Sequence, residues 1–148
     1  TPLYSTSPFK ESADRAIRYL DSIGVPKNKL VIGSAFYART WENVADINNG
    51  LYQSGKFKSF IGYNRFDKLL STDSGFVFYY DTLAKASYAY NKSKKIFATF
   101  DDSLSITDKT RYALAEGLNG IMFWELTLDK KKDGYVDLIN KVVGQYKK

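Results

Sequence analysis

The chain of 148 residues contains neither cysteine nor histidine, and the two absences narrow its chemistry. Without cysteine there is no disulfide framework and no thiolate nucleophile. Without histidine as well, the chain lacks the usual ligands of zinc sites and both the Ser-His and the Cys-His catalytic pairs. We therefore expect no metal site and no cofactor. The lack of cysteine does not fix the compartment.

Long apolar runs are also absent. No stretch approaches the roughly 20 residues of a membrane span, so we expect no membrane partner. The chain opens at Thr1 without an initiator methionine or a signal peptide, which indicates a processed product or a piece of a longer protein. The hydrophobic share of 44% suffices for the core of one domain, or of part of a larger one.

The charge pattern of the chain is ordinary, but its aromatic content is unusual. The formal net charge is +6, but lysine and arginine are scattered and gather only at residues 130–132 and 147–148. That pattern is typical of a solvated surface, and we expect no nucleic-acid partner. The chain has 12 Tyr, 10 Phe and 2 Trp. Such side chains fill cores and strands, and they also stack on sugar rings and bases.

Helix and strand signals alternate at both ends of the chain. Ser12 is a predicted N-cap and Gly24 a predicted helix end. Ser105 with Asp108 resembles a capping box for a helix that stops at Gly117, and a last helix carries apolar residues over 136–146. The runs 30–39 and 120–126 are apolar without alternation in their first parts, which predicts parallel strands buried on both faces.

The middle of the chain differs in texture. Between residues 40 and 102, glycines and asparagines separate short aromatic runs, which predict antiparallel strands at 51–52, 57–63, 76–80, 88–90 and 96–100. Residues 65–70 predict a short helix. The block is too long for a loop, so we interpret it as an inserted subdomain. The predicted division is 1–39, 40–102 and 103–148.

Two parallel strands cannot close a barrel and make a poor open sheet. The sequence therefore indicates an α/β fold from which upstream strands are missing. We expect their absence to leave unpaired strand edges, and hence either self-association of the fragment or residual order confined mainly to the inserted block.

Three residues stand where strands of this kind expose functional side chains. Trp124 lies near the carboxyl end of the run 120–126. Tyr37 and Arg39 are two residues apart, so strand periodicity places them on one face. The alternatives are a core tryptophan and an arginine paired with a structural carboxylate. Glu125 alternates away from Trp124, and a structural role is favoured for it.

Four separated motifs agree with one known family. Residues 33–41 read GSAFYARTW, residues 100–109 read FDDSLSITDK, and residues 117–126 read GLNGIMFWEL. With the opening PLY and the turn GVP at 24–26, they resemble glycoside hydrolase family 18, the chitinases. Alanine replaces the Pro and the second Gly of that family's Gly-x-Pro-Phe-Tyr-Gly-Arg string. Residues 41–100 resemble the chitinase insertion domain.

The resemblance implies a partial (β/α)8 TIM barrel: its last two strands and their flanking helices, carrying an inserted α+β antiparallel subdomain. It implies hydrolysis of β-1,4-linked N-acetylglucosamine polymers by a retaining, substrate-assisted mechanism. Trp124 would lie under the sugar at the cleavage point, with Tyr37, Arg39 and Trp41 beside it. The implied partners are chitin or its oligosaccharides and the missing amino-terminal half, and the implied location is secreted or cell-surface.

The family's acid motif, Asp-x-x-Asp-x-Asp-x-Glu, is absent from this chain, so no catalytic residue is assigned and the fragment is expected to be inactive alone. Two other functions stay open: a chitinase-like lectin, and an N-acetylglucosaminidase acting on peptidoglycan or spore wall. A purely structural use of the aromatics is a third alternative. Further candidates for a cleft wall are Tyr52, Phe57 and Tyr80.

Overall fold

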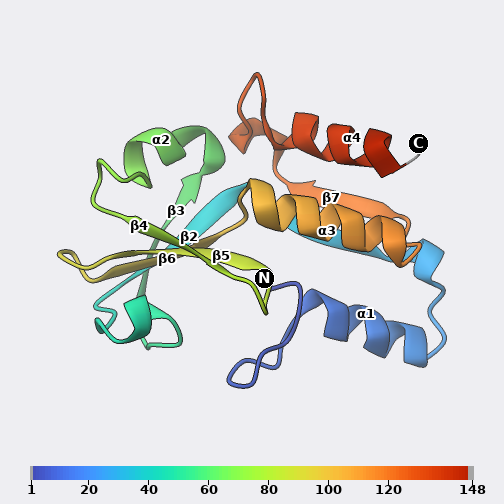
Figure 1. Cartoon of the computed structure of the whole chain (residues 1–148), viewed down its shortest axis with the longest axis horizontal. Coiled ribbons are helices and arrows are strands. Elements are labelled where there is room, and N and C mark those ends of the chain that lie inside the picture. The colour runs from blue at the N-terminus through green and yellow to red at the C-terminus, as the bar shows by residue number, and fades with distance from the viewer. Residues whose placement is uncertain (1, 147–148) are drawn as a thin grey trace.

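The computed structural model describes residues 2–146 and contains two separate sheets, the smaller one packed with three helices and the larger one with a fourth, short helix (Figure 1). The smaller sheet pairs β1 (Val31–Ala35) with β7 (Gly120–Trp124) in parallel. The larger sheet is antiparallel, in the order β3-β2-β6-β5-β4. Its strands are β2 (Tyr37–Glu42), β3 (Lys56–Gly62), β4 (Val77–Asp81), β5 (Ala86–Asn91) and β6 (Ile96–Phe100). The helices are α1 (Ala13–Ser22), α2 (Phe66–Leu69), α3 (Ser103–Ala115) and α4 (Tyr135–Tyr146).

Helix ends follow local signals in the sequence. The Ser12 hydroxyl caps α1 by accepting a hydrogen bond from the Arg15 amide, which confirms the predicted cap. Gly24 follows α1 with a φ of +89°, as a helix stop requires. The predicted capping box at Ser105 and Asp108 is wrong. The Asp102 carboxylate caps α3, and the Ser105 hydroxyl accepts a bond from the Asp102 amide in return.

The small sheet is covered on one face only. Ile32 is buried against α1 and α3 and Ser34 is buried on the same face, whereas Val31 and Met122 are about half exposed on the opposite face. The prediction of strands buried on both faces is therefore wrong for residues 2–146, because the helices pack on one side only. Each strand has one neighbour, so each also has an unpaired edge.

The apolar run 30–39 does not form one strand. The chain leaves the small sheet after Ala35, and β2 begins the antiparallel sheet at Tyr37. Phe36 joins the two sheets: its amide donates to the Trp124 carbonyl and its carbonyl accepts from the Tyr63 amide, both at 2.9 Å. The fully buried Phe36 ring stacks on Phe123 with centroids 4.7 Å apart. The division into segments at 39/40 and 102/103 stays a prediction.

The antiparallel sheet has one face in a core and one facing outward. Ala38, Ala89 and Ala98 pack with α2 and its neighbours on the core side. The predicted strand at 51–52 is wrong, because this segment is a turn in which Tyr52 has a φ of +62°.

Within residues 2–146, no helix combines the length and apolar character that crossing a membrane requires.

Candidate functional site

Trp124 is an exposed side chain at the carboxyl end of β7. Its exposed fraction is 64%, and it lies on the open face of the small sheet opposite Ala35 of β1. The peptide bond that follows it is cis. The alternative of a core tryptophan does not hold for the described structure. An exposed indole offers a flat apolar face that can stack on the C–H face of a sugar.

Tyr37 and Arg39 lie on the outward face of β2, as predicted from their spacing, and Trp41 follows on the same face. The guanidinium of Arg39 lies 5.6 Å from the ring of Trp41, and at similar distances from the rings of Phe57 and Phe60. Among residues 2–146, no carboxylate pairs with it, so the structural ion pair considered from the sequence is not observed. Its hydrogen-bond donors remain available to a ligand.

The junction at Phe36 brings Trp124 and the β2 residues to neighbouring positions. Ala35 is the register partner of Trp124, and Tyr37 follows two residues later, about 7 Å further along the chain. In the described part of the chain, no ring contact or hydrogen bond joins Trp124 to Tyr37, Arg39 or Trp41. The link between the indole and the β2 side chains is therefore the backbone junction at Phe36.

Glu125 and Tyr80 have structural contacts. The Glu125 carboxylate accepts a hydrogen bond from the Thr127 hydroxyl, within the turn that follows β7. The Tyr80 hydroxyl donates to Asp108 on α3 at 2.6 Å. Burial, followed by this hydrogen bond, raises the pKa of Tyr80 above its usual value. Tyr80 therefore faces α3 and lies outside any wall made by the outward face of the sheet.

An aromatic row crosses the outward face of the antiparallel sheet. It consists of Tyr79, Tyr88, Phe97, Trp41, Phe57 and Phe60, with successive ring centroids between 5.0 and 6.3 Å apart. Phe60 also contacts Tyr37 at 5.7 Å. The candidates Trp41 and Phe57 belong to the row. The sequence reasoning missed Tyr79, Tyr88, Phe97 and Phe60, for which strand alternation was the one available signal.

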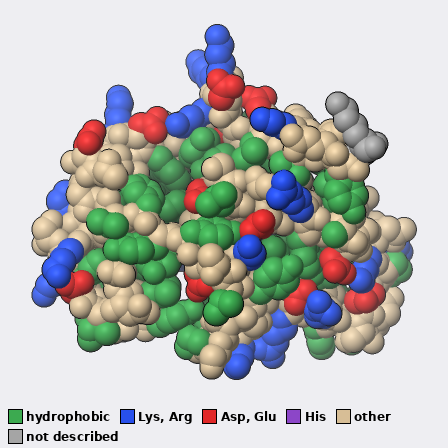
Figure 2. All heavy atoms as spheres, viewed as in Figure 1, with side chains coloured by type: hydrophobic (Ala, Val, Ile, Leu, Met, Phe, Trp, Pro, Cys, Tyr) green, Lys and Arg blue, Asp and Glu red, His purple; other side chains and the backbone are tan. Residues whose placement is uncertain are grey.

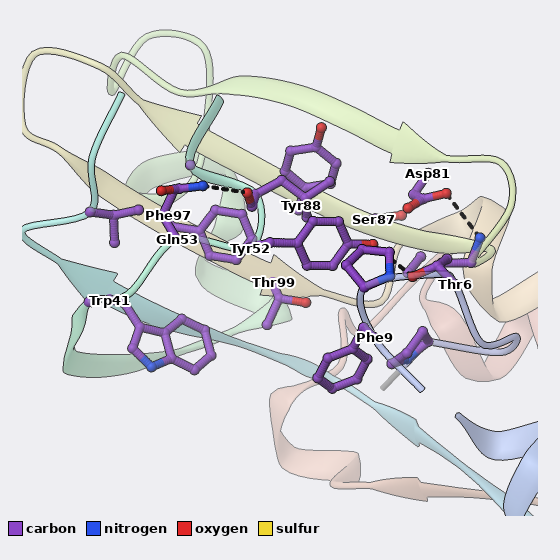
Figure 3. Close-up of a pocket in the computed structure, with 18 of the residues that line it drawn as sticks. Thr6, Phe9, Trp41, Tyr52, Gln53, Asp81, Ser87, Tyr88, Phe97 and Thr99 are labelled. Carbon is purple, nitrogen blue, oxygen red and sulfur yellow. Dashed lines mark hydrogen bonds between the residues drawn. The ribbon is translucent and has the colours of Figure 1, made fainter. Parts of the chain in front are cut away.

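A groove of about 680 Å³ lies over this row (Figure 3). Its floor includes Trp41, Tyr88 and Phe97, and its rim is made by the segment 2–9 and the turn 50–55. The rim segments meet where the hydroxyls of Thr6 and Tyr52 share a hydrogen bond of 3.0 Å. Figure 2 shows hydrophobic side chains over much of one face of the molecule, with charged side chains both among them and along its outline.

A buried ion pair holds the end of β1, next to the junction at Phe36. Lys109 Nζ lies 2.7 Å from both carboxylate oxygens of Asp101, and both side chains are almost fully buried. Asp101 Oδ2 also accepts from the Ala35 amide at 2.8 Å, while its carbonyl accepts from the Tyr135 hydroxyl. These contacts give Asp101 a structural role, and they fix Ala35, the register partner of Trp124.

Comparisons with known proteins agree with one another. The model of the glycosyl hydrolases family 18 matches residues 1–129. Chitinase A1 of Niallia circulans is 38% identical over 122 residues, covering 77% of this chain and 17% of the relative. Chitinase B of Serratia marcescens is 27% identical over 150 residues, covering 84% of this chain and 30% of the relative.

Solved structures lead to the same family. A family 18 N-acetylglucosaminidase from Paenibacillus barengoltzii superimposes with a TM-score of 0.85 at 34% identity, over 96% of this chain and 42% of that one. Chitinase ChiA74 from Bacillus thuringiensis gives a TM-score of 0.89 at 30% identity, over 97% and 28%. This chain thus spans less than half of each of these relatives. With the family match extending over most of its residues, the chain belongs to glycoside hydrolase family 18.

Proposed function

We propose that this chain is the carboxy-terminal part of a glycosidase that cleaves β-1,4-linked N-acetylglucosamine polymers, and that it supplies the sugar-binding wall. The observation that carries the proposal is the exposed indole of Trp124, held by the Phe36 junction beside the outward face of β2. Trp124 stacks under the sugar at the cleavage point. Tyr37 and Arg39 donate hydrogen bonds to its oxygens, and Trp41 extends the wall.

The mechanism is retaining and assisted by the substrate. The acetamido oxygen of the substrate attacks the anomeric carbon while an acid protonates the departing glycosidic oxygen, and water then opens the cyclic intermediate. The acid is not in this chain, whose sequence holds no Asp-x-x-Asp-x-Asp-x-Glu motif. This chain therefore binds and orients the sugar, and is inactive by itself.

The proposal also covers the fold of the parent protein, its partners and its location. β1 and β7 with their helices form the last two strands of a (β/α)8 barrel, and the antiparallel sheet is inserted between them. The good superposition on less than half of the N-acetylglucosaminidase supports this. Chitin or its oligosaccharides and the amino-terminal half of the barrel are the partners. A secreted or cell-surface location is supported by the similar chitinase ChiW of Paenibacillus, described as cell-surface-expressed.

The test is removal of the indole in the full-length protein. Trp124→Ala should lower kcat/KM on chitooligosaccharides by about fivefold, since one aromatic stacking contact contributes on the order of 1 kcal/mol and about 1.4 kcal/mol corresponds to tenfold. Tyr19→Ala is the matched control, because Tyr19 is 63% exposed on the distant helix α1. Equal kinetics in both variants would remove Trp124 from the site.

A second candidate is a binding protein without hydrolysis. A chitinase-like agglutinin from Robinia pseudoacacia superimposes with a TM-score of 0.77 at 25% identity, over 95% of this chain. Both a lectin and a hydrolase need the sugar-binding wall described above. The wall contains no catalytic acid, so it does not distinguish the two functions. Incubation of the full-length protein with chitooligosaccharides separates the two: retention without new reducing ends favours the lectin. Parallel assays with peptidoglycan fragments test the cell-wall alternative.

A further inference from the structure

Strand β3 contains a β-bulge at Lys58. The register of β3 against β2 shifts there by one residue: Thr40 lies opposite Ser59, whereas the next residue of β2 lies opposite Phe57. The shift is fixed on both sides, because the buried Thr40 hydroxyl donates to the Ser59 carbonyl at 3.1 Å and Lys58 pairs with Glu42 at 2.8 Å. A bulge of this kind redirects side chains, since it moves the alternation of faces by one residue.

The bulge brings two phenylalanine rings to the same face of the sheet. Phe57 and Phe60 are three residues apart, and in a regular strand an odd separation places side chains on opposite faces. With one extra residue between them, both rings lie on the outward face, where their centroids are 5.0 Å apart. Phe60 is the register partner of Arg39, and Phe57 is that of Trp41. The register therefore places both rings beside the Arg39 side chain.

The charged end of Arg39 lies over three aromatic rings. The distance from its Cζ atom to the ring centroid is 5.6 Å for Trp41, 5.4 Å for Phe57 and 5.6 Å for Phe60. All three distances are within the range of a favourable cation–π interaction. A carboxylate partner would occupy guanidinium donors, whereas a ring face leaves the N–H groups at the edge of the planar group free. The three rings, together the aromatic clamp, thus contact Arg39 without occupying its donors.

We infer that the aromatic clamp fixes the Arg39 guanidinium and so positions it for hydrogen bonding to the sugar, with Phe60 as the principal positioning residue. Phe60 reaches both of the proposed donors, because the centroids of its ring and that of Tyr37 are also only 5.7 Å apart, edge to face. The inference rests on the proposed function for the role of Arg39. A free arginine side chain has many rotamers, which a ligand must restrict on binding. The clamp restricts them beforehand, so binding loses less conformational entropy.

The experiment asks whether Phe60 acts through Arg39 in the full-length protein. Phe60→Leu and Phe60→Tyr are combined with Arg39 or with Arg39→Met, and kcat/KM is measured on the trisaccharide of N-acetylglucosamine, or Kd if it is not hydrolysed. Phe60→Leu should worsen the value about threefold to fivefold, as loss of one cation–π contact implies, and Phe60→Tyr keeps the ring and should change it less than about twofold. With Arg39→Met, Phe60→Leu should have no further effect. Phe78→Leu, on the opposite edge strand β4, is the control.

A second readout does not depend on activity. Nitrogen-15 relaxation at Nε of Arg39 reports the order of the guanidinium in the ligand-free protein, and Arg39→Met identifies the resonance by its loss. Phe60→Leu should lower this order and Phe60→Tyr should retain it. Phe60 is 60% exposed on an edge strand, so both variants keep the fold.

The outcomes separate this inference from the proposed function. Unchanged order in Phe60→Leu overturns the clamp. So does an equal kinetic loss with Arg39 and with Arg39→Met, because Phe60 then acts on the sugar without Arg39. If the order falls in Phe60→Leu while Arg39→Met leaves the kinetics unchanged, the clamp still fixes Arg39, and the proposed sugar contact of Arg39 is what fails.

Discussion

The Asp101 side chain has three partners, which belong to α3 and to the end of β1. It pairs with Lys109 of α3, accepts from the Ala35 amide at the end of β1, and receives the Ser105 hydroxyl at 3.1 Å. A buried carboxylate needs such a set, because taking a charge out of water is compensated only by several close donors. The pair therefore matters less for net stability than for holding Ala35 in place.

Breaking this pair from one side should be severe. Lys109→Met leaves the Asp101 carboxylate buried without its cation, and we expect the free energy of unfolding to fall by about 3–5 kcal/mol. Urea denaturation of the full-length protein measures it. Lys58→Met removes a solvent-exposed partner of Glu42 and should change little. Similar denaturation midpoints for both variants would contradict the buried role.

Single residues were predictable where the cause is local. The cap at Ser12 and the stop at Gly24 depend on backbone groups within a few residues, and both were read from the sequence. The shared face of Tyr37 and Arg39 follows from strand periodicity alone. The contacts of Arg39 with Phe57 and Phe60 depend on strand pairing, which the local pattern does not contain.

At the scale of elements, α3 depends on its amino-terminal cap. Asp102 satisfies the Ser105 amide, and Ser105 satisfies that of Asp102, so two otherwise unpaired donors are bonded. The sequence reasoning placed the start of this helix too late because Ser105 and Asp108 also fit the spacing of a box. Residue spacing alone could not choose between the two.

Removing the cap should weaken the protein moderately. Asp102→Ala should lower the free energy of unfolding by about 1 kcal/mol, because the Ser105 amide loses its acceptor. Asp73→Ala, at an exposed turn position, provides the control. Thermal unfolding of the two variants side by side measures the difference, and coincident curves would argue against the cap.

The sequence pattern did not predict the break between β1 and β2. Residues 30–39 carry apolar side chains without a proline or a turn signal at Phe36, so a single strand was the natural interpretation. The chain turns there because the Phe36 backbone bonds to the ends of two different strands. The groove was missed for a similar reason, since the segment 2–9, the turn 50–55 and four strands meet only in the folded chain.

For the molecule as a whole, alkaline pH should be destabilising. Burial, the largest cause in each case, raises the pKa of Tyr112 and Tyr135 above the usual value near 10. Below pH 10 both folded and unfolded states keep these protons, and their contribution to stability is complete. As pH rises, the unfolded state ionises first, so the free energy of unfolding falls until the folded pKa is passed.

Urea denaturation at pH 8 and at pH 11, with phenolate absorbance recorded, tests this expectation. The midpoint should be lower at pH 11, and the phenolate signal should rise with unfolding. Tyr135→Phe should reduce the dependence of the free energy of unfolding on pH, because the variant lacks one phenol that ionises on unfolding. Tyr19→Phe, at an exposed position, should not reduce it. Identical pH slopes in both variants would contradict the assignment to Tyr135.

The isolated chain should self-associate. β1 and β7 each have an unpaired edge, and Val31, Met122 and Trp124 are exposed on one apolar face of the small sheet. Sedimentation velocity of residues 1–148 should show oligomers, and Met122→Lys should reduce them by placing a charge on that face. A monomer in which both strands resist hydrogen exchange would refute the expectation.

The Phe36 peptide has a consequence for the thermodynamics of recognition. Its two hydrogen bonds reach strand ends of both sheets, so neither sheet can tilt against the other without breaking a backbone bond. A sugar that bridges Trp124 and the β2 side chains meets an opening whose width is already set. Little conformational entropy is then lost from the protein on binding, and the affinity reflects the contacts themselves.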